Sequence, residues 1–130
     1  MHKNYLITAS LFGALAVALG AFGAHGLKKI ADTDTVATFQ TGVQYQMYHA
    51  LALLVVAILF ERFPNKWIKW AGSCFIIGII LFSGSLYLLT ALKAGSAVVG
   101  LKGIGIITPF GGVFFIAGWL FLLLGIMKKN

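Results

Sequence analysis

Imidazole, amide and phenol groups are the side chains in this sequence that could do chemistry in an apolar environment. They gather in residues 38–49, TFQTGVQYQMYH, where Gln40 and Gln44 lie one helical turn apart and Tyr45 lies one turn before His49. A second imidazole, His25, closes an earlier apolar run. An imidazole can gain or lose a proton near neutral pH, so these residues could bind a ligand, switch or relay protons. Polar groups are costly in hydrocarbon unless they find partners, so they are candidates for function.

Catalysis and metal binding find little support in the same residues. No carboxylate is expected inside the membrane to pair with a histidine, no serine stands in a nucleophile turn, and Glu61 falls at the opposite end of its helix. A metal site built from His25, His49 and either Asp32 or Asp34 lacks any close ligand spacing. We therefore expect no enzyme activity, no catalytic residues, no cofactor and no metal site.

The composition is that of a membrane protein. Of 130 residues, 60% are hydrophobic and only 10% are charged, and the mean hydropathy is +0.96, which is far from the values of an ordinary soluble domain. Ten Lys and Arg residues against three Asp and Glu give a net charge of +7. The cationic residues stand at the ends of apolar runs, a pattern that indicates membrane topology rather than a nucleic-acid surface. Cys74 has no partner for a disulfide and is expected to be a packing residue.

We predict an all-α fold, a single domain over residues 1–130 formed by a bundle of four transmembrane helices. Each span needs roughly 20 apolar residues, and the runs give spans at about 5–24, 42–62, 68–90 and 108–127. The first run is about span length, so we expect it to be retained rather than cleaved as a signal peptide. Asp32, Thr33 and Asp34 are candidate helix caps, so we expect the second helix to run from about residue 35 to residue 60 and to begin with an amphipathic extension. Residues 91–107 read as a loop, with Pro109 in the first turn of the last helix.

Small residues recur along the first and last spans and are predicted to form packing seams. Such faces let neighbouring backbones approach closely in a membrane, where dispersion contacts rather than hydrophobic exclusion drive helix association. The packing residues that we single out are Gly13, Gly20 and Gly23 in the first span, and Gly111 and Gly118 in the last.

Four spans place both termini on one side of a cell membrane, the inner or plasma membrane. Six cationic residues fall at the end that holds the termini and four at the other end: Lys3, Arg62, Lys66, Lys69, Lys128 and Lys129 against Lys28, Lys29, Lys93 and Lys102. The bias predicts that both termini are cytoplasmic.

When the four spans are placed in one bilayer, the uncharged polar residues of all four lie toward the end of the bundle opposite the termini. Our leading hypothesis is a non-enzymatic protein with a polar pocket there that binds a small molecule or a lipid. The same residues could instead be hydrogen-bonding clamps in a structural subunit that docks another copy or another membrane protein through its small-residue faces. A small transporter, or a proton relay through His25 and His49, is a further alternative. The proposed ligand-binding residues are His25, Gln44, Tyr45, His49, Ser83, Tyr87 and Thr108.

Four motifs resemble a small bacterial membrane protein family, typified by YgdD and YwdK, that has a small animal transmembrane relative. They are GAFGAHGL at 20–27, FQTGVQYQMYHALALL at 39–54, FSGSLYLL at 82–89 and ITPFGGVFFIAGW at 107–119. The resemblance covers essentially the whole chain. It implies a four-helix protein of the inner membrane and assigns no activity, substrate or catalytic residues. The motif positions are Gly23, His25, Gly26, Gln44, Tyr45, His49, Ser83, Tyr87, Pro109 and Gly112.

Overall fold

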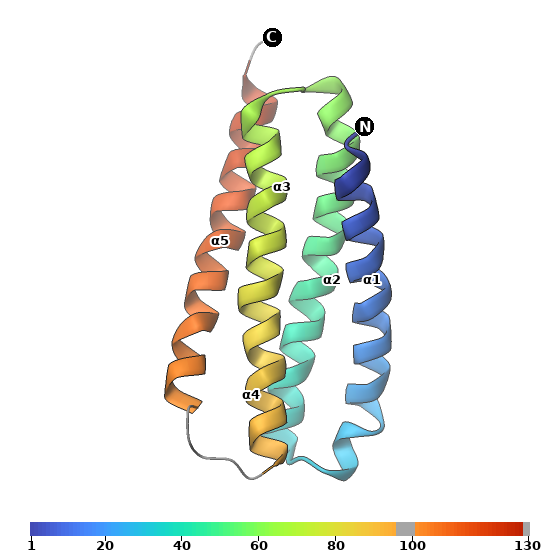
Figure 1. The fold of residues 1–130 in the computed structure, drawn as a ribbon, viewed down its shortest axis with the longest axis vertical. Helices are drawn as coiled ribbons and strands as arrows, with labels where there is room; N and C mark the ends of the chain where they lie inside the picture. The colour runs from blue at the N-terminus through green and yellow to red at the C-terminus, as the bar shows by residue number, and fades with distance from the viewer. Residues whose placement is uncertain (96–100, 129–130) are drawn as a thin grey trace.

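The structure, a computed structural model, is a bundle of long helices. It describes the backbone of residues 1–95 and 101–128, and the side chains of the same residues except 101 and 102. Within these residues there is no β-strand, so the predicted all-α class is confirmed. In chain order the elements are α1 (Lys3–Ala24), η1 (Leu27–Lys29), α2 (Thr33–Arg62), α3 (Lys66–Gly78), η2 (Ile79–Ser83), α4 (Gly84–Ala94) and α5 (Leu101–Met127) (Figure 1).

Four helical stretches of the described chain are long and apolar enough to cross a membrane, as predicted. One of them combines three elements, because α3, η2 and α4 run on as a single rod from Lys66 to Ala94. The η2 segment within this rod is a short π-helix, a wider turn that often marks functional positions in helices.

The expected loop over residues 91–107 is wrong at both ends. The rod continues to Ala94, and α5 already begins at Leu101, so that Pro109 lies inside the helix rather than in its first turn. Backbone groups within a bilayer must be bonded internally, which favours continuing a helix through a proline over opening it. Residues 96–100 of the expected loop lie outside the described residues.

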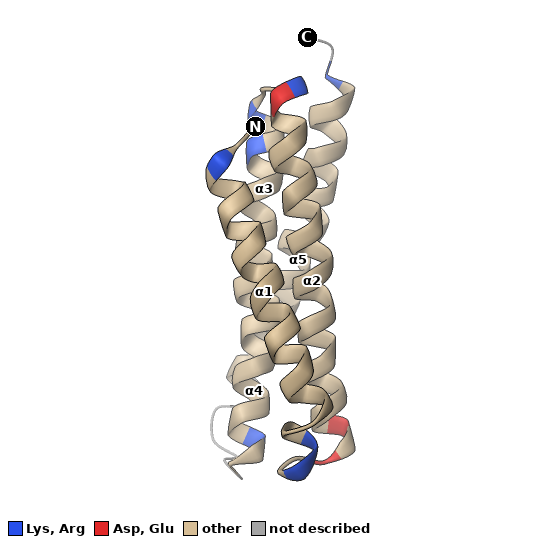
Figure 2. Ribbon diagram, turned by 90° about the vertical axis from the view of Figure 1, so that its right-hand side faces the viewer, with Lys and Arg blue, Asp and Glu red and all other residues tan. Residues whose placement is uncertain are grey.

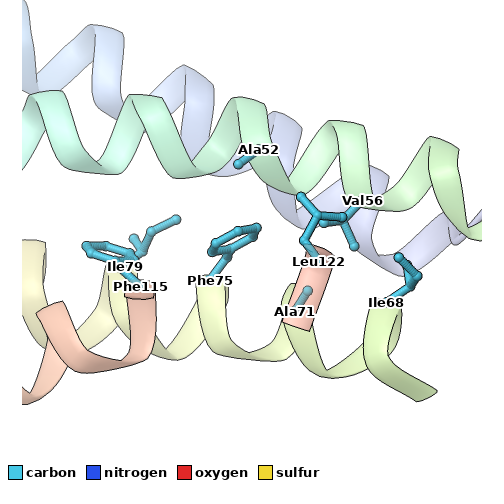
Figure 3. Packing of buried hydrophobic residues seen from close by; sticks show 8 residues of the cluster. All are labelled: Ala52, Val56, Ile68, Ala71, Phe75, Ile79, Phe115 and Leu122. Carbon is cyan, nitrogen blue, oxygen red and sulfur yellow. The ribbon is translucent and has the colours of Figure 1, made fainter. Parts of the chain in front are cut away.

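The helix α2 and the rod form the centre of the bundle. The helix α1 packs along α2, and α5 packs along the rod on the other side (Figure 1). Figure 3 shows the main apolar core, to which α2, the rod and α5 all contribute. Its buried residues are Ala52, Val56, Ile68, Ala71, Phe75, Ile79, Phe115 and Leu122. A second cluster, made of Leu27, Val36, Phe39 and Val43, fills the end of the bundle near η1.

Two polar caps set where the central helices begin. The side chain of Asp32 accepts a hydrogen bond from the backbone N–H of Thr35 at 2.7 Å, which starts α2. Asn65 accepts from the N–H groups of Trp67 and Ile68 at 3.1 and 3.2 Å and starts α3. Its Nδ2 also donates to the carbonyl oxygen of Gly125 at 2.9 Å, so the same residue ties this turn to the end of α5.

Among the described residues, Lys, Arg, Asp and Glu occur at the two ends of the bundle and are absent from its middle (Figure 2). The start of α1 and the end of α5 lie at the same one of these ends (Figure 1). This separation is the pattern of a membrane-spanning bundle whose ends face water.

Four of the five glycines chosen as packing residues face a neighbouring helix. A Cβ added at Gly20 would lie 3.3 Å from Val43, and one at Gly23 would lie 2.8 Å from Phe39. In α5, a Cβ at Gly111 would strike the backbone of Phe82, and one at Gly118 would lie 2.6 Å from Phe75. At Gly13 a Cβ would meet no atom within 4 Å, so this glycine is open within the single chain.

Candidate binding site

Gln46 is the centre of a polar core that joins three helices. Its Nε2 donates to the carbonyl oxygen of Phe12 in α1 at 2.8 Å, and its Oε1 accepts from the hydroxyl of Tyr87 in α4 at 2.6 Å. The side chain is only 3% exposed. Because both ends of the amide are bonded, Gln46 fixes the heights of α1, α2 and α4 relative to one another.

This core lies near the middle of the membrane span. Phe12 stands close to the centre of α1, whose 22 residues make a helix of roughly 33 Å, about the thickness of a hydrocarbon layer. Gln46 is therefore near mid-depth, and so are Gln44, Tyr45 and His49 beside it. The polar residues of α2 thus lie deeper than the outer-end position expected from the sequence. The first turns of α2, which were expected to form an interfacial extension, instead pack along α1, where Phe39 lies against Gly23 and Val43 against Gly20.

Ser83 forms a second link between α2 and the rod. Its Oγ donates to the carbonyl oxygen of Gly42 at 2.6 Å, and its side chain is fully buried. Gly42 permits this approach, since a Cβ there would lie 3.0 Å from the ring of Tyr87 and 3.3 Å from Leu86. On the other side of η2, Gly111 of α5 lies against the backbone of Phe82. The π-helical segment is therefore held between glycines of two neighbouring helices.

His49 is bonded through both ring nitrogens. Its Nδ1 lies 2.7 Å from the carbonyl oxygen of Tyr45, and its Nε2 accepts from the indole Nε1 of Trp119 at 3.1 Å. An indole N–H only donates, so Nε2 is the acceptor and the proton sits on Nδ1, which makes the ring neutral. The ring also stacks on Phe115 with centroids 3.6 Å apart. In this arrangement His49 links α2 to α5 and has neither nitrogen available for a ligand.

The other proposed residues do not join this core. Thr108 bonds through its Oγ1 to the Oγ of Ser85 at 2.6 Å, a contact between α4 and α5. His25 is exposed at the end of α1, roughly 20 Å from His49 along the bundle by the rise per residue. Gln44 is exposed on the outer surface of α2, whereas Tyr45 is 38% exposed and its ring packs on Phe82 of η2 with centroids 4.7 Å apart. The structure therefore does not bring the seven residues around one pocket.

Sequence reasoning missed Gln46 and Trp119 as hydrogen-bonding partners. The signal for Gln46 was present, because it stands four residues after Gly42 and three before His49, on the buried face of α2. Trp119 gave no such signal, since a tryptophan in an apolar run is equally expected to face lipid.

A cavity of about 270 Å³ lies next to the polar core, at the end of the bundle that holds η1. It is bounded by α1, η1, α2 and α4 and is lined by Phe22, Leu27, Ile30, Phe39, Tyr87, Thr90, Ala91 and Ala94. Tyr87 contributes to both features, with its ring in the cavity wall and its hydroxyl on Gln46. Of the seven proposed ligand-binding residues, Tyr87 is the one that lines this cavity.

Thr90 is the polar exception in this apolar wall. The residue is 3% exposed, and its Oγ1 has no hydrogen-bond partner among the described residues. Ser10, Thr38 and Thr41 instead donate to the carbonyl four residues earlier in their own helices. A buried hydroxyl without a partner carries a desolvation cost of about 1–3 kcal/mol. The cavity wall therefore holds a hydrogen-bonding group that the described chain leaves unused.

Basic residues surround this end of the bundle. Lys28 and Lys29 lie in η1, and Lys93 lies in the last turn of α4. Lys28 also lines a second hollow of about 350 Å³ together with Ala31, Thr33 and Val36. Hydrogen bonds from the side chain and backbone of Thr35 lower the pKa of Asp32 below 3.8, and Lys93 adds to this effect. Near neutral pH this end thus carries both signs, with an excess of positive charge.

In the described part of the chain, no three His, Cys, Asp or Glu side chains come together. The available chemistry is thus an apolar cavity, a free hydroxyl and nearby ammonium groups.

Comparison with known proteins places this architecture in a family. The family described as "Protein of unknown function (DUF423)" matches residues 19–112. The chain belongs to the DUF423 family. Every residue that lines the cavity falls within the matched range. The resemblance to YgdD is confirmed by a UPF0382 inner membrane protein of that name from Escherichia coli K12, which is 41% identical over 95% of this chain and 88% of its own length.

Two further relatives of this DUF423 protein match over almost their whole length. A UPF0382 membrane protein of Haemophilus influenzae is 43% identical over 100% of this chain and 98% of its own, and one of Staphylococcus saprophyticus is 40% identical over 97% and 98%. No solved structure matches the DUF423 chain. Together with the four candidate spans, these relatives identify it as a multi-pass membrane protein.

Proposed function

We propose that this protein is a non-enzymatic membrane protein that binds the acyl chain of a lipid in the cavity between α1, η1, α2 and α4. The observation that carries the proposal is the buried Thr90 hydroxyl, which lacks a partner in an otherwise apolar wall. An ester carbonyl at the head of an acyl chain is an acceptor that this hydroxyl would satisfy.

The shape and lining of the cavity support an apolar ligand. Six of its eight lining residues are aliphatic or phenylalanine side chains. Its volume of about 270 Å³ is slightly below that of usual ligand pockets, roughly 300–1,000 Å³. It suits one part of a chain rather than a whole lipid. The remainder of the lipid would lie along the outer surface of the bundle.

The charge at this end supports an anionic headgroup. Lys28, Lys29 and Lys93 lie at the end of the bundle where a headgroup would sit if its chain entered the cavity. Basic residues at helix ends attract acidic lipid headgroups. We therefore propose an acidic glycerophospholipid, such as phosphatidylglycerol, as the ligand class.

Transport through a single copy is less well supported, because the hydrogen bonds from Gln46 to Phe12 and Tyr87 close the polar route at mid-depth. A relay between His25 and His49 would need further groups across the roughly 20 Å between them.

The cavity can be filled to test the proposal. In Ala94→Phe a ring would occupy part of the cavity, whereas the control Ala14→Phe adds the same ring on the exposed face of α1. Native mass spectrometry of protein taken from vesicles of phosphatidylglycerol and phosphatidylcholine should show one retained phosphatidylglycerol on the wild type and on Ala14→Phe. Ala94→Phe should lose it. Equal retention by all three proteins would refute the proposed site.

We also propose that the cavity end faces away from the cytoplasm. The start of α1 and the end of α5 lie at the opposite end, to which the sequence assigns six cationic residues against four. A reporter fused after Asn130 should be active inside the cell. Activity only on the outer side would reverse this orientation.

A further inference from the structure

Polar side chains also occupy the outer face of α2, where lipid would surround a single chain. Thr41, Gln44 and Tyr48 stand at helical spacings of three and four on this face. Gln44 is exposed and Tyr48 is 57% exposed. The hydroxyl of Thr41 is satisfied by the carbonyl of Ala37 at 3.1 Å. The Gln44 amide and the Tyr48 hydroxyl have no hydrogen-bond partner among the described residues.

The depth of these two groups makes their exposure costly. Gln44 and Tyr48 flank Gln46 by two residues on either side, which is about 3 Å along the helix axis. Gln46 is bonded to the middle of α1, so both groups lie close to the centre of the bilayer. No water is available at that depth to replace the missing bonds, and an interfacial role, which suits tyrosines near helix ends, does not apply.

We infer that this face of α2 is an interface between two copies of the chain, paired about a two-fold axis along the membrane normal. Two copies inserted in the same direction would bring α2 alongside α2 with each residue at the same depth as its counterpart. An amide both donates and accepts, so Gln44 is complementary to Gln44 of a second copy, and each group that one copy leaves unpaired is matched by the other. This self-complementarity is the reason for choosing a second copy over a different protein.

The interface continues toward the end of the bundle that holds the termini. Leu51, Val55 and Ile58 follow on the same stripe at steps of four and three, and all three are about half exposed. The α5 helix offers no equivalent, since its strongly exposed residues near this depth, Val113, Ile116 and Leu120, are apolar. Apolar side chains are satisfied by lipid alone, so the polar stripe distinguishes α2 from α5.

Cysteine cross-linking in vesicles of phosphatidylethanolamine and phosphatidylglycerol tests this inference. Leu51→Cys places a thiol on the proposed interface without removing Gln44, and Ile116→Cys places one on the lipid face of α5. Both are made with Cys74→Ala, because Cys74 is the one cysteine of the chain. Oxidation should link Leu51→Cys into a dimer and leave Ile116→Cys monomeric. Equal cross-linking of the two, or none, would overturn the inference.

Energy transfer between separately labelled wild-type chains provides a measurement that does not depend on the cysteine variants. Gln44→Leu should raise the dissociation constant of the dimer about tenfold, and Tyr48→Phe should raise it less. Ser10→Ala, on the exposed face of α1, should leave it unchanged. A wild type that remains monomeric over the full range of protein-to-lipid ratios would contradict the inference, as would a dimer that Gln44→Leu does not weaken.

Discussion

The indole nitrogen of Trp119 donates to Nε2 of His49 at 3.1 Å, and this bond joins α5 to the centre of the bundle. It accounts for the neutral, fully bonded state of the one histidine that lies within the span. The His49 ring, although titratable and placed in the middle of the membrane, serves here to connect two helices. Gln46 and Ser83 also connect helices, so the packing of the helices accounts for the polar core without any ligand.

The His49 and Trp119 pair should show energetic coupling. Trp119→Phe leaves Nε2 of His49 without a donor, and His49→Phe removes both of its bonds. In a double-mutant cycle on unfolding in detergent, we expect a coupling of about 0.6–1.7 kcal/mol, which runs from the average to the largest value found for hydrogen bonds between membrane helices. Strictly additive effects would mean that the bond contributes nothing to stability.

Replacing Gln46 should cost more than replacing Tyr87. Gln46→Leu removes the bonds to both Phe12 and Tyr87, whereas Tyr87→Phe removes one of them. We expect losses in the free energy of unfolding of about 1–3 kcal/mol for Gln46→Leu and about 1 kcal/mol for Tyr87→Phe. The measurement is unfolding in mixed micelles, with Ser10→Ala as the control. A larger loss of unfolding free energy for Tyr87→Phe than for Gln46→Leu would contradict the central place of Gln46 among these hydrogen bonds.

Two adjacent glycines in α5 provide a matched test of close packing. A Cβ at Gly111 would strike the backbone of Phe82, whereas one at Gly112 has its nearest neighbour 4.0 Å away. Gly111→Ala should therefore destabilise the protein by about 1–3 kcal/mol, and Gly112→Ala should be nearly neutral. Similar thermal unfolding midpoints for the two variants would show that η2 and α5 can separate without cost.

A variant at Thr90 distinguishes a structural role of its hydroxyl from a role in lipid binding. Thr90→Val keeps the shape of the side chain but removes the unpartnered hydroxyl. Without lipid we expect the variant to be as stable as the wild type or more stable, because a buried group without a bond is lost. In phosphatidylglycerol vesicles it should retain less lipid. A clear loss of stability in detergent would indicate that Thr90 bonds elsewhere in the protein.

The pH dependence at the start of α2 has a defined direction. The pKa of Asp32 is lowered in the folded state by the hydrogen bonds from Thr35, so its contribution to stability is present above the ordinary value of 3.8 and declines as the pH falls through the folded value. Thermal unfolding between pH 7 and pH 3 should show a smaller loss for Asp32→Asn than for the wild type. Parallel curves would assign the loss to other carboxylates.

The number and order of the helices could be predicted from the sequence, because runs of span length and flanking cations determine them. The start of α5 could not, since Pro109 suggests a helix start in isolation while the apolar surroundings favour a continuous helix. The hydrogen-bonding partners of the polar residues could not be predicted from the sequence either. Whether Gln46 or Gln44 faces the bundle depends on how α2 is rotated against α1 and α4, and packing decides this rather than local pattern.

Labelling by a photoactivatable lipid tests the binding cavity most directly. Phosphatidylglycerol that carries a diazirine on one acyl chain would be irradiated with the wild type in vesicles and the labelled residues mapped. The account predicts labels concentrated on the cavity wall, at Phe22, Phe39, Ala91 and Ala94, and competed by unlabelled phosphatidylglycerol. Labels spread evenly over Val113, Ile116 and the other lipid-facing residues of α5, without enrichment at the cavity, would contradict it.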